Sequence, residues 1–256
     1  MGMTPTQLDE WAAVLTEARR SRVTREAITA THELSVADAY AIQQRVTAVR
    51  LARGEHIVGW KLGYTSLAMR EQMGVHEPNF GPLTDAMVLA DGAQVSTALI
   101  HPRVEPEIGL RFARPLAGEV SIDDVLAAVE ECFACLEVVD SVYTDYRFRL
   151  EDNTADGSSA AQVVVGPAFE TADLAAVHVE LTHNSTPVAH ATGAAASGHP
   201  AAGVAGLVAR LAERGQRVEP GQIVITGGLT KAVALMPGDT IGALFDGSVA
   251  VAVSRS

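Results

Sequence analysis

The stretch HPRVEPEIGL, residues 101–110, decides how the rest of this chain is interpreted. If it forms a β-strand, its successive side chains point to opposite faces of a sheet. One face is then apolar and packs on a core, while the other face carries two carboxylates. The apolar face has Val104, Pro106, Ile108 and Leu110, and the opposite face has Arg103, Glu105, Glu107 and Gly109.

Glu105 and Glu107 would stand side by side, with Gly109 next to them leaving room for a ligand. Two adjacent anions repel each other, and burying them unpaired is unfavourable. A divalent metal ion would neutralise both. A solvated strand face with a charged edge is the alternative interpretation, because Glu-x-Glu alone is a common pattern.

Length, composition and charge exclude several classes of protein. The 256 residues allow one large domain or a small domain against a larger one. With 48% hydrophobic and 20% charged residues, the chain is neither disordered nor a coiled coil. The net charge of −12 argues against nucleic acid and anionic membranes as main partners. We see no secretory signal or spanning apolar run and expect a cytoplasmic protein.

Apolar residues are spaced as in helices at the start of the chain, and the patterns typical of β-strands dominate after it. Apolar residues recur at helical spacing from Leu8, and Ser35 with Asp38 resembles a capping box for a second helix that Gly54 ends. We expect residues 1–55 to form a helical segment and residues 56–256 to form the main domain. Further helices are predicted at 66–73, 121–131 and 201–214, and loops at 75–82 and 153–159. Strands are predicted at 56–63, 101–110, 132–140, 162–165, 177–181, 188–190, 223–228 and 248–253.

Two further charged residues stand out from their surroundings. Lys61 lies in the predicted strand 56–63 with glycines on its own face, which predicts an open space around it; a surface lysine on an edge strand is the alternative. Glu137 lies in an apolar run, where a carboxylate must be paired, metal-bound or neutral. Satisfaction by an arginine or by backbone donors is the alternative for Glu137.

The two cysteines indicate packing rather than chemistry. Cys132 and Cys135 have Cys-x-x-Cys spacing, but a zinc site needs two more soft ligands, and the pair begins a strand rather than a helix. The chain also lacks a Gly-x-Ser-x-Gly elbow, a Walker loop and a dinucleotide fingerprint.

Taken together, the motifs resemble the 2-keto-4-pentenoate hydratase / 2-oxo-3-hexenedioate (4-oxalocrotonate) decarboxylase family of the fumarylacetoacetate hydrolase superfamily. The resemblance covers nearly the whole chain and depends on the order and spacing of its pieces. These are DAYAIQQ at 38–44, VGWKLGYTS at 58–66, HPRVEPE at 101–107, LEVVDS at 136–141, AD with Ser159 at 155–159, GHP at 198–200 and TGGLT at 226–230.

This resemblance implies an α+β fold, in which a helical N-terminal part precedes a mixed β-roll of the fumarylacetoacetate hydrolase type. It implies Mg²⁺, or alternatively Mn²⁺, held by Glu105, Glu107 and Glu137, since carboxylate oxygens suit a hard cation. A small 2-oxo acid would chelate that metal. Catalytic roles are predicted for Lys61, Asn79 and Ser159, and substrate contacts for Thr65, Ser66, Asp156, Gly228 and Thr230.

Two lyase activities of aromatic meta-cleavage degradation compete within the family. The family's hydratases carry an Asp where this chain has Asn79, and an amide cannot take a proton from water. The decarboxylases need no such base, and their carboxyl-terminal motif resembles residues 227–230. We therefore predict decarboxylation of 2-oxo-3-hexenedioate, with hydration of 2-hydroxypenta-2,4-dienoate as the alternative.

The chain departs from the family pattern at Gly157, where the family has Asn, and at Gly206, where it has Trp. An acylpyruvate C–C hydrolase, with His32 and Glu33 as its base pair, and a non-catalytic partner subunit are further alternatives. We expect a homo-oligomer, with a related hydratase subunit as a possible second partner.

Overall fold

The computed structural model describes residues 2–66, 70, 75 and 78–256, so most of the helix predicted at 66–73 lies outside the described residues. The architecture is α+β, as predicted. Its α-helices are α1 (Pro5–Ser21), α2 (Val36–Leu51), α4 (Ile122–Ala128), α5 (Leu150–Ala155) and α6 (Pro200–Ala212). Its strands are β1 (Ile57–Gly63), β2 (Asn79–Thr84), β3 (Val88–Ala90), β4 (Arg103–Phe112), β5 (Val129–Val139), β6 (Ala160–Phe169), β7 (His178–His183), β8 (Thr186–Thr192), β9 (Ile223–Ile225), β10 (Val233–Ala234), β11 (Thr240–Phe245) and β12 (Val249–Ser254).

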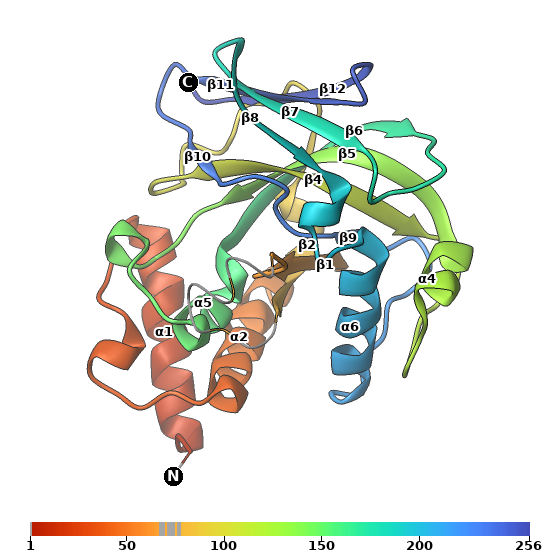
Figure 1. Ribbon diagram of the computed structural model, residues 1–256. Helices are drawn as coiled ribbons and strands as arrows, with labels where there is room; N and C mark the ends of the chain where they lie inside the picture. The colour runs from red at the N-terminus through yellow and green to blue at the C-terminus, as the bar shows by residue number, and fades with distance from the viewer. Residues whose placement is uncertain (1, 67–69, 71–74, 76–77) are drawn as a thin grey trace.

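Within the described residues, two sheets form the β-roll. The larger sheet has the order β2-β1-β9-β4-β5-β6-β3, with β10 paired to β4, and the smaller has the order β12-β11-β7-β8. The larger sheet curls, as Figure 1 shows, with α6 packed below it and the smaller sheet above. The apolar face predicted for β4 is confirmed, because Val104, Ile108 and Leu110 are fully buried in the main core.

The N-terminal helices lie together with α5 at one end of the molecule (Figure 1). Thr4 caps α1 and Ser35 caps α2, each with its hydroxyl accepting from a backbone N–H in the first turn. Leu15 and Ile42 of these helices share a second apolar core with Tyr143, which lies beyond residue 56. The division into 1–55 and 56–256 stays a prediction, because this core joins the two parts.

Several element boundaries differ from the sequence prediction. The predicted loop 75–82 contains the start of β2, which pairs antiparallel with β1 and tolerates Pro82 because it is an edge strand. The predicted loop 153–159 instead holds the end of α5 and a short 3₁₀ turn, η4 (Gly157–Ser159). The helix predicted to reach residue 131 ends at Ala128, where β5 begins.

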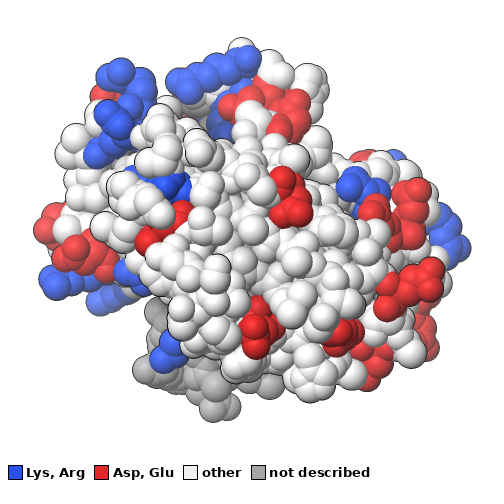
Figure 2. Space-filling view, turned by 90° about the horizontal axis from the view of Figure 1, so that it is seen from above, with Lys and Arg blue, Asp and Glu red and all other residues white. Residues whose placement is uncertain are grey.

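Surface charge is mixed on the face seen in Figure 2, where acidic side chains stand among groups of Lys and Arg and broad uncharged areas. No helix within the described part of the chain combines the length and apolar character needed to cross a membrane.

Candidate metal centre

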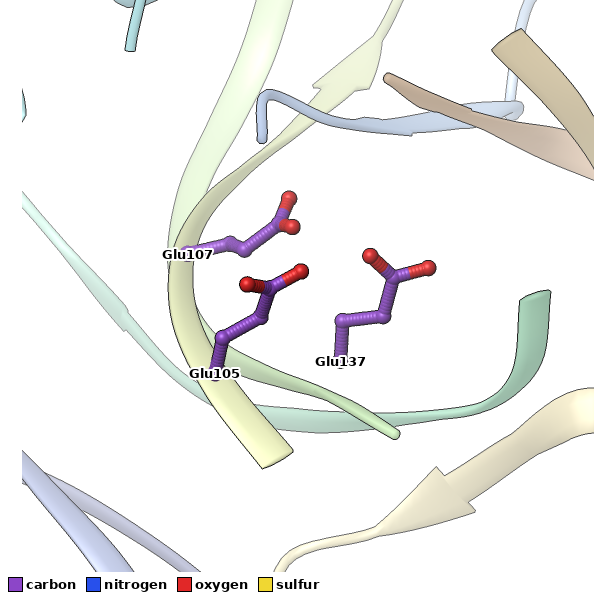
Figure 3. A group of neighbouring side chains, drawn as sticks. All are labelled: Glu105, Glu107 and Glu137. Carbon is purple, nitrogen blue, oxygen red and sulfur yellow. The ribbon is translucent and has the colours of Figure 1, made fainter. Parts of the chain in front are cut away.

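Strand pairing brings the three predicted metal ligands together. β4 and β5 are antiparallel neighbours, and their register sets Glu105 directly opposite Glu137. Glu107 lies two residues along β4 and so points to the same face. In Figure 3 the three carboxylates, two from β4 and one from β5, point toward one another.

The geometry of this acidic cluster fits a hard divalent cation. Each of Glu105, Glu107 and Glu137 offers a carboxylate oxygen within 4.8 Å of the others. Glu107 and Glu137 are fully buried, so the solvated-face interpretation is wrong. Oε1 of Glu107 and Oε1 of Glu137 are buried without a hydrogen-bond partner in the described structure. Buried carboxylate oxygens that lack donors are the ligands that Mg²⁺ accepts.

Electrostatics within the cluster also favour a cation. Burial, together with the nearby Glu137 carboxylate, raises the pKa of Glu105 to about 7. The same two causes raise the pKa of Glu107 well above its ordinary value. A bound divalent cation would remove this mutual repulsion, because an opposite charge favours the ionised form.

A glycine pair after β9 lies against two of the three carboxylates. The backbone N–H of Gly227 donates to Glu107 Oε2 at 2.7 Å. A Cβ atom at Gly228 would collide with Glu105 Oε2, and one at Gly227 would collide with the Thr65 side chain. Only glycine allows the backbone to approach this closely. The space predicted beside Gly109 is not open, because the ring of Phe133 fills it.

Lys61 provides the cation nearest to Glu137. Its Nζ lies 3.0 Å from Glu137 Oε2, so the interpretation that an arginine or backbone donors satisfy Glu137 is wrong. The edge-strand alternative for Lys61 is also wrong, since β1 lies between β2 and β9. The surroundings are packed rather than open, because Lys61 is only 3% exposed. Burial by itself lowers the pKa of Lys61, but the three carboxylates raise it above its ordinary value.

Ser158, which the sequence prediction missed, links Lys61 to Asn79. Lys61 Nζ donates to the Ser158 carbonyl at 2.9 Å and to its hydroxyl at 3.2 Å. That hydroxyl donates to Asn79 Oδ1 at 2.9 Å. The Asn79 amide in turn donates to Asn153 Oδ1 and Thr154 Oγ1, each at 2.9 Å. The sequence prediction named the neighbouring Ser159 instead. Only the polar composition of the predicted loop 153–159 indicated Ser158.

The other predicted site residues lie around this network. Ser159 is buried, and its hydroxyl accepts from the Asn153 amide at 2.9 Å. Ser66 and Thr230 are half-buried, and Thr65 is buried beside Gly227. Both carboxylate oxygens of Asp156 have internal partners, which speaks against the substrate contact predicted for it.

The two family departures have different surroundings. Gly157 has a φ of 69° in η4, a left-handed conformation that glycine adopts without strain. At Gly206 a Cβ would meet nothing within 4 Å, so the missing aromatic side chain leaves no gap in the core. His32, a residue of the acylpyruvate hydrolase alternative, packs edge-on against Trp11.

We expect the metal-free protein to lose stability as the pH rises from about 4.5 through about 7, the unfolded and folded pKa values of Glu105. Glu105 has a folded-state pKa of about 7, above its unfolded value, so it contributes stability that is lost as the pH rises through 7. Mg²⁺ should therefore raise the melting temperature more at pH 8 than at pH 6, where protons compete for the carboxylates. Thermal unfolding with and without Mg²⁺ measures this, with Glu105→Gln as the control that should respond less to pH. Equal Mg²⁺ stabilisation at both pH values would contradict the prediction.

Comparison with known proteins agrees with this fold and site. No protein-family model matches the chain. 4-Oxalocrotonate decarboxylase from Pseudomonas putida is 40% identical over 220 residues, covering 84% of this chain and 83% of that protein. 2-Hydroxyhexa-2,4-dienoate hydratase from Comamonas testosteroni is 37% identical over 241 residues, covering 91% of each chain. The solved 4-oxalocrotonate decarboxylase from Pseudomonas putida G7, complexed with magnesium and adipate, superimposes with a TM-score of 0.95 at 34% identity over 99% of both chains.

The curled sheet with its cluster of three buried-face carboxylates is a β-roll of the fumarylacetoacetate hydrolase type that carries a candidate metal centre. A fumarylacetoacetate hydrolase family protein from Yersinia pestis CO92, 15% identical with a TM-score of 0.58, shares the fold alone. The chain belongs to the 2-keto-4-pentenoate hydratase / 4-oxalocrotonate decarboxylase family. The predicted family and fold are thereby confirmed, as are lyase chemistry and a magnesium cofactor at the level of the family. The roles of individual site residues stay predictions.

Proposed function

We propose that this chain decarboxylates 2-oxo-3-hexenedioate, or a close 2-oxo dicarboxylic acid, to 2-hydroxypenta-2,4-dienoate and carbon dioxide in the degradation of aromatic compounds. The observation that carries the proposal is the neutral Asn79, whose amide is buried and fully hydrogen-bonded inside the protein. An amide in this state cannot act as the base that hydration needs. Similarity to the two decarboxylases above supports the same activity.

Glu105, Glu107 and Glu137 would hold Mg²⁺ at this site. When bound, the ion would supply Lewis-acid polarisation of a chelating 2-oxo acid. Two observations support a metal ion at this cluster. Buried carboxylate oxygens of Glu107 and Glu137 have no hydrogen-bond partner among the described residues, and the pKa values of Glu105 and Glu107 are raised.

Lys61 would supply a fixed positive charge rather than a base. Because its pKa is raised, Nζ keeps its proton at neutral pH. A preorganised cation of this kind stabilises negative charge that develops during the reaction. Nζ donates to the Ser158 carbonyl and hydroxyl and lies 3.0 Å from Glu137 Oε2 in an ion pair. A hydrogen bond from Lys61 to substrate therefore requires one of these contacts to be exchanged.

The role of Asn79 differs from the one that the sequence suggested. It was predicted to have a catalytic role, but both of its amide hydrogens have partners inside the protein. In this proposal Asn79 orients the Ser158 hydroxyl, and Ser158 holds Lys61.

Hydration of 2-hydroxypenta-2,4-dienoate is the second candidate, favoured by the hydratase relative that covers 91% of the chain. One product assay separates the two. The purified protein with Mg²⁺ is given each substrate, and carbon dioxide release and dienoate consumption are followed. Efficient hydration without carbon dioxide release would overturn the decarboxylase proposal and require another residue to activate water.

We expect Asn79→Asp to lower decarboxylation at least ~10-fold, since it puts an anion beside Asn153 Oδ1 in a buried network. It should also gain slight hydration activity by restoring a base. Steady-state rates on both substrates measure the change, with Asn184→Asp in the surface turn between β7 and β8 as the control. Unchanged decarboxylation by Asn79→Asp would remove Asn79 from the mechanism.

The proposal includes a cytoplasmic homo-oligomer that can associate with a related hydratase subunit. Light scattering of the purified chain, alone and mixed with such a subunit, measures both assemblies.

A further inference from the structure

Away from the metal centre, helix α1 contributes a charge to a buried cluster of two aspartates. Arg19 Nη2 lies 2.7 Å from Asp156 Oδ1, and Arg19 Nη1 donates to the Asp140 carbonyl at 3.1 Å. Nη1 also lies 3.9 Å from Asp140 Oδ2. Both aspartates are almost fully buried, while the Arg19 side chain is 24% exposed. One guanidinium thus holds two chain segments that lie 121 and 137 positions from it in the sequence.

Asp140 connects this cluster to the strands that carry the metal ligands. It follows directly on β5, and its two carboxylate oxygens accept from the backbone N–H groups of Ile100 and His101 at 2.9 and 2.8 Å. These residues precede β4. Asp140 therefore fixes the entry to β4 against the exit from β5, three residues from Glu137.

Asp156 connects the same cluster to the turn that holds Lys61. Its Oδ2 accepts from the Val142 N–H at 3.1 Å, and the residue lies immediately before η4. In η4, Gly157, Ser158 and Ser159 have φ values of 69°, 57° and 55°. Non-glycine residues in this left-handed region are strained and keep the conformation only when their surroundings hold it.

We propose that Arg19 is a positioning residue for the reaction, which acts through Asp140 and Asp156 on the metal ligands and on the Ser158 contact of Lys61. This inference builds on the proposed function. It gives the N-terminal helical segment a part in the chemistry, although α1 supplies none of the three ligands. The physical reason is that a planar guanidinium can hold a carboxylate and a carbonyl in fixed relative directions, which a lysine cannot do.

The test uses full-length Arg19→Ala, Arg19→Lys and the control Arg20→Ala. Arg20 is the next residue of α1 and makes an exposed ion pair with Glu17. Because Arg19→Ala leaves two buried aspartates without their cation, a double variant, Arg19→Met with Asp156→Asn, keeps the charge balanced. Each protein is assayed below its melting temperature for kcat, KM and the magnesium dissociation constant, and Arg19→Ala is also assayed with millimolar guanidinium.

We expect Arg19→Ala and the double variant to lose kcat on the order of 10²-fold, as displaced catalytic groups do. The magnesium dissociation constant should rise about 10-fold, as it does when support of metal ligands is lost. Guanidinium should restore part of the activity of Arg19→Ala, and Arg19→Lys should recover only part of the loss. Arg20→Ala should behave as wild type and should not respond to guanidinium.

A lower melting temperature with unchanged kcat and magnesium affinity would overturn the inference, because it would show a purely structural role. The proposed function is judged separately, on the wild-type protein. If the wild type turns over neither substrate, the proposed function fails, and the magnesium affinity of the Arg19 variants alone decides this inference.

Discussion

Glu105→Gln is expected to abolish turnover and to weaken Mg²⁺ binding while leaving the fold intact. The change removes one of three carboxylates that lie within 4.8 Å of one another, and an amide oxygen is a poorer ligand for a hard cation. The loss of kcat should exceed the roughly 10–100-fold that loss of an outer-shell partner costs at a metal site. Calorimetric titration with Mg²⁺ and steady-state rates measure the two effects.

Although Glu105→Gln lowers activity and Mg²⁺ affinity, it should make the metal-free protein more stable. Glu105 repels Glu137 across the strand pair, so its neutral isostere should raise the melting temperature in the absence of metal at pH 8. The matched control is Glu131→Gln on the same strand as Glu137, where the carboxylate forms a half-exposed pair with Arg111. Full activity of the wild-type protein in a strong chelator would rule out the metal centre.

Lys61→Ala is expected to lower kcat on the order of 10²-fold or more, with a smaller effect on KM, if its charge acts as an oxyanion-hole donor does. The structure adds a second consequence. Without Lys61, Glu137 loses the only cation within 4.0 Å that the described residues give it, so the metal-free protein should also lose stability. Steady-state kinetics and thermal unfolding with and without Mg²⁺ separate these effects.

Lys61→Met provides the matched comparison, because it keeps most of the side-chain volume and removes only the charge. It should lose as much activity as Lys61→Ala. If only KM rises in either variant, Lys61 binds substrate without stabilising the developing charge.

Much of the site could be predicted because it depends on local patterns. The two-residue period of β4 placed Glu105 and Glu107 on one face and its apolar residues on the other. The packing of Val104, Ile108 and Leu110 in the main core and the convergence of the carboxylates confirm that division. Glu137 stood out because a carboxylate in an apolar run needs a partner. These inferences needed only the alternation of side chains along a strand. The order of the motifs then indicated the family.

Pairing between distant segments could not be predicted in this way. The register of β4 against β5, which sets Glu105 opposite Glu137, depends on how both strands pack in the sheet. The same packing filled the space beside Gly109 with Phe133 and buried Lys61 among carboxylates. Turn formers at 75–82 predicted a loop, whereas pairing with β1 made part of that segment an edge strand.

The sequence by itself therefore determined the types of side chain in the site and the face of the strand that presents them, since both follow from local geometry. The tertiary structure alone decided which groups those side chains contact. Asn79 was predicted from the sequence as a catalytic residue, but it hydrogen-bonds Ser158, and Arg19 gave no sequence signal at all. Contacts of this kind join residues more than 70 positions apart, and their geometry is fixed only when sheets, turns and helices pack together.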